Sequence, residues 1–411
     1  MTEPLSSVPT RPAPATERLY WTQPQAQSFS ASVTAVRGRE VALDRTLFYP
    51  EGGGQSCDTG TLRWPSGVAQ VTDVQKDGGT IWHTVEVELP PVGSSVEGSL
   101  DWARRYRHSQ RHTGEHLLAQ AFYRVNPAFG VRSVSMRGPE CTLDLAGQPG
   151  ESHVRAAQTL LTEMLRAPLT LDTQMVPAAE LDAYPLRRPP QVSGQVRVVL
   201  FRTASGEIWE ASACGGTHLP SAVQAAPVVV IRTERVKNDL TRVTFMAGEE
   251  ATERLSSVYA QVQTLARGFS VGVDRLPDKV ADLQTEVQEA KAAAARTRRR
   301  LAAVLLEQAD WKHVPKGQAA LVEANDDLLS PLLEAAGERG GAVTVVLTPD
   351  GRCGVASDLP EYPAGTLMRD WLAVSGGRGG GRPELAQGQA ERPNDFRMAV
   401  QRWLNALPLP E

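Results

Sequence analysis

Residues 110–123 read Gln-Arg-His-Thr-Gly-Glu-His-Leu-Leu-Ala-Gln-Ala-Phe-Tyr. Apolar side chains recur in this stretch at the three- and four-residue spacing of one helix face, at Leu117, Leu118, Ala121 and Phe122. That spacing predicts an α-helix with a buried side. The sequence before this helix has a different period, so we expect the helix to open a new domain.

The segment of residues 28–100 alternates short Val-, Thr- and Leu-rich runs with Gly, Pro and Asp. Runs of this kind, separated by turn residues, predict a small antiparallel β-barrel. The segment that follows residue 102 mixes strand-like and helical patterns and predicts an α+β domain. From residue 249 the composition shifts toward Ala, Glu, Gln, Arg and Leu, broken only at residues 268–277, which predicts a long helical arm.

The last hundred residues alternate helix-like and strand-like segments, as expected for an α/β module. We therefore expect a multidomain α+β chain. Its predicted parts are a disordered tail at 1–20, a β-barrel at 21–102, an α+β domain at 103–248, a helical arm at 249–310 and a C-terminal α/β domain at 311–411.

The chain has 411 residues and four cysteines, with 43 basic against 47 acidic residues and a formal net charge of -4. Few, scattered cysteines argue against a disulfide framework, and the N-terminus lacks the pattern of a signal peptide. No run of about 18 apolar residues occurs. We expect a cytoplasmic protein that does not enter a membrane.

Because the net charge of the chain is slightly negative, any contact with a polyanion must depend on a local cluster of basic residues. Two arginine clusters are candidates, although for either cluster alone a solvated helix face is the favoured interpretation: Arg104, Arg105, Arg107 and Arg111, and Arg296, Arg298, Arg299 and Arg300.

His112 and His116 lie four residues apart on the predicted helix, so both imidazoles can reach one ion. Far downstream, the run Cys214-Gly215-Gly216-Thr217-His218 offers a thiolate and another imidazole around two glycines. Together the two pairs form a nitrogen and sulfur donor set that suits zinc. Four protein ligands would give a closed site, whereas three leave room for water or substrate, and the sequence does not decide between them.

The first pair also fits the H-x-x-E-H string of a class of metalloproteases, in which Glu115 would be the general base. That reading leaves Cys214 and His218 unexplained. We therefore expect Glu115 to lie on the helix surface, and we expect Glu115→Gln to retain most activity.

A third segment contains Thr46, runs through three adjacent glycines at 52–54 and ends at Gln55. With the two metal motifs, it resembles the editing domains of alanyl-tRNA synthetases and their free-standing AlaX relatives. The resemblance implies Zn²⁺ at His112, His116, Cys214 and His218. It also implies that Thr46 senses the hydroxyl of a wrongly attached serine and that Gln55 lines the aminoacyl pocket.

By the same resemblance, the chain is a hydrolase that cleaves the ester of mischarged tRNA(Ala), carrying serine, glycine or both. No ATP-binding motif is evident, so no ligase activity is expected. The glycine-rich segment near the C-terminus resembles the loop of the DHHA1-type domain in long AlaX proteins. It implies tRNA contacts at Arg378, Gly379, Gly380, Gly381 and Arg382.

The family resemblance also suggests a homodimer through the helical arm or the C-terminal domain. Two alternatives to the editing hydrolase remain: a non-catalytic tRNA-binding protein with a structural zinc, and the H-x-x-E-H metalloprotease. Zinc-dependent release of serine or glycine, as opposed to RNA binding alone or peptide cleavage, separates the three.

Overall fold

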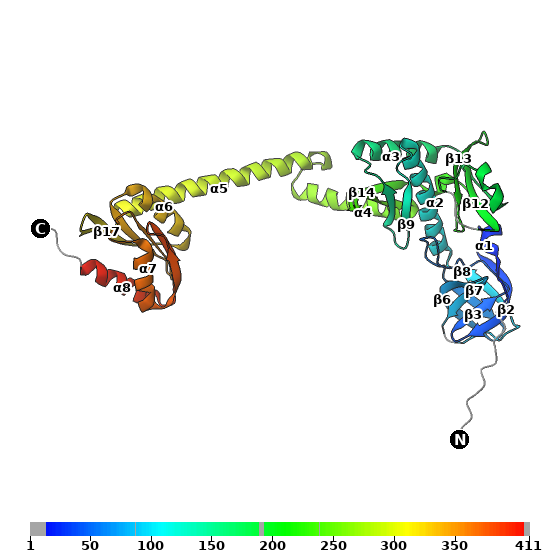
Figure 1. Ribbon diagram of the computed structural model, residues 1–411, viewed down its shortest axis with the longest axis horizontal. Coiled ribbons are helices and arrows are strands. Elements are labelled where there is room, and N and C mark those ends of the chain that lie inside the picture. Colours follow the sequence, from blue (N-terminus) through cyan, green and yellow to red (C-terminus); the bar gives the residue numbers. More distant parts are fainter. Residues whose placement is uncertain (1–13, 87, 189–192, 238, 407–411) are drawn as a thin grey trace, which may run out of the picture. The chain divides into compact units, whose positions relative to one another are not determined.

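The computed structural model describes residues 14–86, 88–188, 193–237 and 239–406. The chain divides into two compact units, Met1–Val262 and Gln263–Glu411. Figure 1 labels the helices and several of the strands of both units.

The first unit begins with a closed six-stranded barrel of strand order β2-β3-β7-β6-β5-β8. Alternate residues of β2 are buried, because successive side chains of a strand point to opposite faces and one face lines the barrel core. The expected antiparallel barrel is confirmed. The strands are β2 Ser28–Arg37, β3 Glu40–Leu43, β5 Gly60–Trp64, β6 Gly67–Asp77, β7 Thr80–Val85 and β8 Ser95–Leu100.

The expected disordered tail is too long at its C-terminal end. Residues 1–13 lie outside the described residues, but strand β1 (Glu17–Arg18) pairs in parallel with β4 (Arg45–Thr46), and helix α1 (Leu19–Thr22) follows. The Thr16 hydroxyl donates to the Leu43 carbonyl, and the side chains of Leu19 and Tyr20 are buried against the barrel. This burial orders a segment whose composition suggested disorder.

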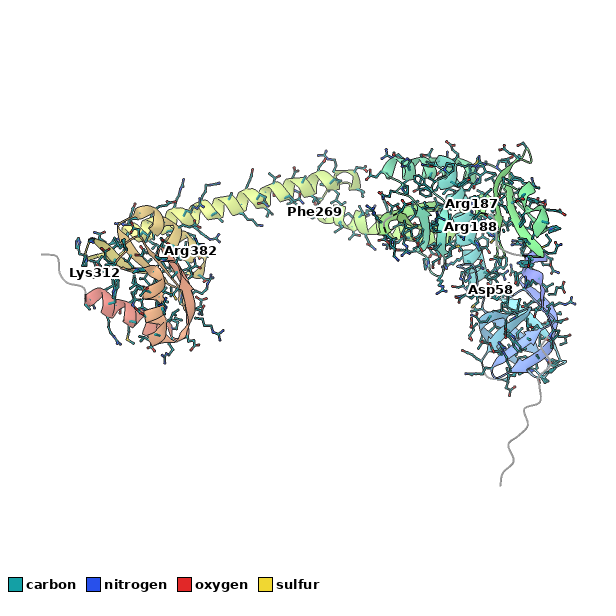
Figure 2. The ribbon with its side chains drawn as sticks, viewed as in Figure 1. Asp58, Arg187, Arg188, Phe269, Lys312 and Arg382 are labelled. Carbon is teal, nitrogen blue, oxygen red and sulfur yellow. The ribbon has the colours of Figure 1, made fainter. Side chains whose placement is uncertain are left out.

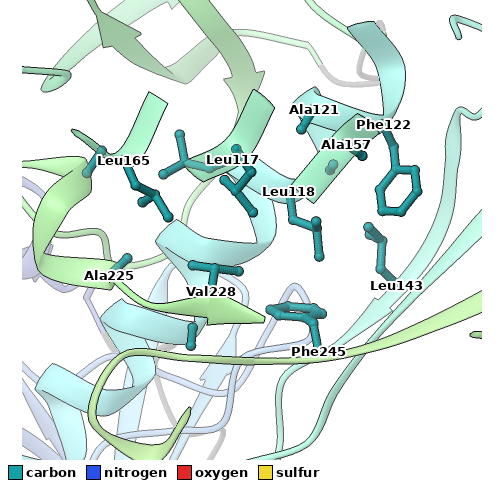
Figure 3. Close-up of a cluster of buried hydrophobic side chains, with 14 of the residues drawn as sticks. Leu117, Leu118, Ala121, Phe122, Leu143, Ala157, Leu165, Ala225, Val228 and Phe245 are labelled. Carbon is teal, nitrogen blue, oxygen red and sulfur yellow. The ribbon is translucent and has the colours of Figure 1, made fainter. Parts of the chain in front are cut away.

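Beside the barrel, helix α2 (Trp102–Val125) packs against helix α3 (Glu151–Arg166) and two antiparallel sheets. Figure 3 shows the core between them, where Leu117, Leu118 and Phe122 of α2 meet Leu143 and Phe245 of the larger sheet. The helix predicted from the 110–123 pattern is thus confirmed. The sheet strands are β9 Val131–Ser135, β10 Cys141–Ala146, β14 Val228–Lys237 and β15 Leu240–Ala247 in one, and β11 Thr170–Pro177, β12 Gln195–Arg202 and β13 Ile208–Ala213 in the other.

A buried ion pair fastens α2 to the barrel. Asp101 caps the helix, since its carboxylate accepts a hydrogen bond from the Arg104 amide at 3.1 Å. One residue further on, the Arg105 guanidinium contacts both carboxylate oxygens of Asp58, and both side chains are at most 1% exposed. Figure 2 marks Asp58 on the barrel. The pair fixes the direction in which α2 leaves the barrel.

The expected helical arm is two helices, α4 (Gly248–Gly268) and α5 (Leu276–Glu307), joined through the short 3₁₀ segment η3 (Val273–Arg275). The break falls within residues 268–277, where the sequence predicted it. Pro277 lies in the first turn of α5, where proline's missing amide hydrogen needs no partner. The other 3₁₀ segments are η1 Ala178–Ala183, η2 Ala222–Ala225 and η4 Asp326–Leu328.

The second unit contains a six-stranded mixed sheet of order β16-β17-β18-β19-β21-β20. Helices α7 and α8 pack on one face, and α6 with the end of α5 packs on the other. The elements are α6 Leu329–Arg339, α7 Ala364–Ser375, α8 Pro393–Asn405, β16 Lys312–Val314, β17 Gly317–Glu323, β18 Ala342–Leu347, β19 Arg352–Ser357, β20 Gly377–Gly381 and β21 Leu385–Ala390.

The glycine-rich segment is an edge strand and not the expected loop. Strand β20 pairs antiparallel with β21, and Arg382, marked in Figure 2, lies in the turn between them. A Cβ on Gly379 would lie 2.6 Å from Leu372 and 2.7 Å from the Gly388 backbone, so glycine lets α7 pack directly on this strand pair. Within the described residues, no helix is long and apolar enough to span a bilayer.

Candidate metal centre

Four side chains from two distant segments meet in the first unit. One donor atom each from His112, His116, Cys214 and His218 lies within 4.8 Å of the others. The Cys214 Sγ is 3.3 Å from the His112 Nε2 and 3.4 Å from the His218 Nε2. All three imidazoles therefore surround one thiol, as the two motifs predicted.

Local backbone geometry explains the convergence. Helix α2 presents His112 and His116 on one face, while the turn after β13 carries Cys214 and His218. Within that turn, a Cβ on Gly216 would lie 2.1 Å from the His112 ring. Only glycine allows the backbone to approach the helix this closely.

Gln55 orients the His112 ring. Its side-chain oxygen accepts a hydrogen bond from His112 Nδ1 at 2.7 Å, while its amide donates to the Thr217 hydroxyl at 2.9 Å. Because Nδ1 carries the hydrogen, the Nε2 lone pair of His112 is left for an ion. The predicted residue Gln55 thus reaches the centre as a support for a ligand, and it is not among the residues that line the cavity described below.

Glu210 lies within ion-pair distance of His116 Nδ1 without a hydrogen bond to it, and it was missed from the sequence. Its Oε1 lies 3.4 Å from His116 Nδ1 and 3.0 Å from the Arg187 guanidinium. Burial opposes ionisation of Glu210, but His116 and Arg187 hold its pKa at about 2. The strand register places Glu210 here, because it pairs with Phe201 beside the register shift in the β12–β13 ladder. A lone acidic residue inside the strand-like run 208–213 was the available signal.

The protonation states of the cluster are mixed: burial opposes the charge of His116, but Glu210 and Cys214 raise its pKa well above the usual value, so His116 would have to lose a proton before it could bind an ion. Burial alone would raise the pKa of the Cys214 thiol, but the imidazoles of His112, His218 and His116 lower it well below its usual range. Burial, together with the nearby charge of His112, lowers the pKa of His218 to about 3. A thiolate beside a neutral imidazole is the protonation state that a metal ion needs.

The donor set fits zinc. In a tetrahedral zinc site, bonds of about 2.0–2.3 Å place neighbouring donor atoms roughly 3.3–3.8 Å apart. The two sulfur–nitrogen distances fall within that range. Gln55 and Glu210 supply the outer contacts that such ligands require.

The centre opens into a cavity of about 410 Å³. Aromatic side chains of Tyr20, Trp21 and Tyr49 form part of its wall, and Gly52 and Gly53 of the glycine-rich segment form another part. The Trp21 indole donates to the Gly215 carbonyl at 2.8 Å, which ties α1 to the cysteine turn. A group of amino-acid size can therefore reach the His and Cys donors.

Glu115 is not on the helix surface, as the sequence suggested, but lines this cavity. It is 5% exposed, and its Oε2 lies 3.7 Å from the His116 Nε2. The side chain faces inward because α2 is covered on several sides, by the barrel and by both sheets. Glu115 thus stands where it can act on a bound group.

Thr46 does not line the cavity. Its hydroxyl lies 2.8 Å from His83 Nε2 and accepts a hydrogen bond from the Phe48 amide at 3.0 Å. His83 Nδ1 donates to the Val41 carbonyl, so Nε2 is the acceptor of the Thr46 hydroxyl. Burial lowers the pKa of His83 to about 4 and keeps the ring neutral. Thr46 is thus enclosed in the barrel and is not among the residues that line the described cavity.

The remaining predicted residues belong to the second unit. Arg378, Gly379, Gly380 and Gly381 lie on the exposed edge strand β20, and Arg382 is exposed in the following turn. Neither arginine guanidinium has an ion-pair partner among the described residues. They are therefore available to an anionic ligand of that unit.

A barrel joined to an α+β layer that holds three histidines and one cysteine around a cavity defines the first unit as a candidate metalloprotein. Residues 16–104, which include the whole barrel, match the family model described as tRNA synthetases class II (A). The relationship extends well beyond the barrel.

The chain is 32% identical to the alanine–tRNA ligase of Thermococcus kodakarensis over 399 residues, which are 94% of this chain and 43% of that protein. It is 31% identical to the alanine–tRNA ligase of Pyrococcus furiosus over 409 residues, 96% of this chain and 44% of that protein. The C-Ala domain of Aquifex aeolicus alanyl-tRNA synthetase matches 24% of this chain and 97% of that domain, at 21% identity and a TM-score of 0.22, which is too low to support an argument.

Over nearly its whole length the chain is thus similar to alanine–tRNA ligases, in agreement with the resemblance that its motifs indicated. It spans less than half the length of the curated relatives that it matches.

Proposed function

We propose that this chain is a trans-editing hydrolase that removes serine, glycine or both from mischarged tRNA(Ala). The observation that carries the proposal is the three-histidine, one-cysteine centre opening into a cavity of about 410 Å³. The relationship to alanine–tRNA ligases supports tRNA(Ala) as the partner. The absence of ligase activity remains an expectation.

In this proposal His112, His116, Cys214 and His218 hold Zn²⁺. When bound, the zinc would supply a Lewis acid that polarises the ester or the attacking water. Gln55 and Glu210 keep the Nε2 atoms of two histidines turned toward the ion through their contacts at Nδ1. Walls of aromatic side chains and glycine backbone orient the aminoacyl group and exclude bulk water.

Glu115 is the proposed general base. Its carboxylate belongs to the cavity wall and lies beside the donor atoms, so Oε2 can accept the proton of a water that attacks the ester carbonyl. The bond between the carbonyl carbon and the ribose oxygen then breaks, and the released ribose hydroxyl takes a proton. This role replaces the surface position expected from the sequence.

Neither alternative gains a specific observation. The protease reading shares Glu115 but uses a carboxylate ligand, whereas the third and fourth donors here are Cys214 and His218. The binding-module reading does not account for a carboxylate and a cavity beside the centre. The tRNA contacts of Arg378 and Arg382, and a homodimer through the arm or the C-terminal domain, stay proposals.

The test is hydrolysis of Ser-tRNA(Ala), Gly-tRNA(Ala) and Ala-tRNA(Ala) by the purified protein, with and without zinc, beside His116→Ala. Zinc-dependent release of serine or glycine that spares alanine is the expected result. Binding of tRNA without any release would favour the binding module. Cleavage of peptides without response to tRNA would favour the protease.

A further inference from the structure

A second cavity, of about 300 Å³, lies along the N-terminal half of α2. Basic side chains dominate its lining: Arg104, Arg107, Arg111, Arg137 and His108. Three of the arginines belong to the cluster that the sequence left open between an RNA contact and a solvated helix face. In the structure these three guanidinium groups differ in their partners.

The carboxylates in the lining are already engaged. Asp101 caps α2 at the Arg104 amide, and Glu250 contacts the Arg111 guanidinium at 2.5 and 2.6 Å. The Arg104 guanidinium reaches a backbone carbonyl, that of Cys57 at 3.1 Å, and has no carboxylate within ion-pair distance in the described part of the chain. Arg104 therefore has guanidinium N–H groups that no carboxylate of the described residues pairs with.

Arg107 and Arg137 form ion pairs with carboxylates that do not line this cavity. Arg107 is partly exposed and contacts Glu249 and Glu253 of α4, while its Nε has no hydrogen-bond partner among the described atoms. Arg137 contacts Glu51 at 2.9 Å. An anion in the cavity could use the remaining donors of these guanidinium groups without displacing a buried ion pair.

His108 provides a second, independent observation. Its side chain lines the cavity, the residue is 4% exposed, and Nδ1 is buried without a hydrogen-bond partner in the described residues. A buried polar atom without a partner is unfavourable, which indicates a missing ligand. Burial, then the charges of Arg104, Arg111 and Arg105, lower the pKa of His108 to about 3, as expected in a positive potential.

The cavity is coupled to the metal centre through two short connections. His108 precedes the ligand His112 by one turn of α2, and Arg111 is the residue before it. The Arg137–Glu51 ion pair joins the lining of this cavity to a residue that lines the metal cavity. A ligand that occupies both cavities would place an anionic group in the basic cavity. Under the proposed function, its aminoacyl ester would lie in the metal cavity.

We infer that this cavity binds a backbone phosphodiester of the RNA whose aminoacylated 3′ end enters the metal cavity. Arg104 and His108 Nδ1 are the donors, with Arg107 at the rim. Guanidinium groups match the geometry of phosphate oxygens, and such contacts fix the position of an RNA without reading its sequence. The inference rests on the proposed function for the identity of the RNA.

The first test measures binding of non-aminoacylated tRNA(Ala) to the full zinc-loaded chain by fluorescence anisotropy at several salt concentrations. Arg104→Gln should weaken binding about tenfold, the effect of losing one charged hydrogen bond. It should also lower the slope of log K against log salt by about one. Arg63→Gln, at an exposed barrel arginine outside this cavity, is the matched control and should change neither value.

The second test compares two esters. Arg104→Gln should lose kcat/KM on Ser-tRNA(Ala) but match the parent on 3′-O-seryl-adenosine, which has no phosphodiester. Should Arg104→Gln fold poorly by its thermal midpoint, Arg107→Gln at the rim takes its place, with about a threefold loss.

The outcomes separate this inference from the proposed function. Unchanged RNA binding and salt slope in a folded variant would overturn the phosphodiester site, even if the parent deacylates Ser-tRNA(Ala). Weakened RNA binding in the variant would support the site, even if the parent hydrolyses no ester. Tight binding of inorganic phosphate that Arg104→Gln abolishes, with RNA affinity unchanged, would show a free-anion site and overturn the inference.

Discussion

At the scale of single residues, Glu115 and Thr46 lie at positions that differ from those expected from their sequence contexts. Glu115 was expected on the surface and lines the metal cavity, whereas Thr46 was expected at the substrate and is enclosed in the barrel. Both differences have one cause. The direction of a side chain depends on what covers its element, and neither helical spacing nor motif position specifies that cover.

Glu115→Gln keeps the size of the side chain but removes its ability to accept a proton. If the Glu115 carboxylate takes the proton of the attacking water, kcat on Ser-tRNA(Ala) should fall by about 100-fold or more, while zinc content stays the same. Single-turnover deacylation with metal analysis measures both. Retention of most activity would return Glu115 to a structural role, and Glu207→Gln at an exposed position is the control.

Thr46→Val removes the hydroxyl that His83 and the Phe48 amide use. The buried His83 Nε2 then lacks a donor, so we expect a loss of about 1–3 kcal/mol in the free energy of unfolding. Because Thr46 does not line the cavity, we expect the ratio of Ser-tRNA(Ala) to Ala-tRNA(Ala) hydrolysis to stay the same. Urea unfolding and paired deacylation assays would test this, and an altered ratio at unchanged stability would contradict it.

At the scale of elements, helix α2 organises the first unit. Its C-terminal half fills the core, its middle provides two metal donors, and its N-terminal half is fastened to the barrel through the buried Arg105–Asp58 contact. The same helix therefore connects the barrel to the candidate metal centre and fixes the position of one relative to the other. Its sequence reveals the apolar face but not the partner of Arg105.

Asp58→Asn should destabilise the first unit strongly. The variant leaves the buried Arg105 guanidinium without a countercharge, and breaking a buried ion pair from one side costs about 3–5 kcal/mol. Chemical unfolding of the variant beside Asp77→Asn, whose pair with Arg37 is exposed, measures the difference. Equal, small effects of both substitutions would show that the buried pair does not hold the helix.

At the scale of the whole molecule, the chain has two compact units, and all four metal donors belong to the first. Metal bound only by the folded state stabilises that state by mass action, by about 2.7 kcal/mol at a free concentration 100 times Kd. The second unit has no part in this centre. Metal binding should therefore affect the two units unequally.

Chelation of zinc should lower the unfolding temperature of the first unit by roughly 5–10 °C and leave that of the second unchanged. Differential scanning calorimetry of the full chain, with and without chelator, would resolve the two transitions. His116→Ala should no longer respond to chelator. A shift of both transitions, or of neither, would contradict the assignment of a zinc site to the first unit alone.

The sequence by itself determined the barrel, helix α2, the break in the helical arm and the four residues of the candidate metal centre. These features are local, because each is specified by a pattern of neighbouring residues. The patterns are alternation, helical spacing, helix-breaking residues and soft donor atoms in short motifs. The sequence also indicated the similarity to alanyl-tRNA synthetases, because three such motifs occur in one order. The glycine-rich segment was not specified in this way, since its pairing with β21 depends on a partner strand.

Tertiary structure alone decided which side chains face which. The Cys214 Sγ meets the ring of His112 across 102 positions of the chain, and Glu210 reaches His116 only because β13 lies in register with β12. Packing turned Glu115 inward, enclosed Thr46 and left His108 beside a basic cavity. Long-range packing sets side-chain direction, burial and charge balance together, so no local pattern specifies them.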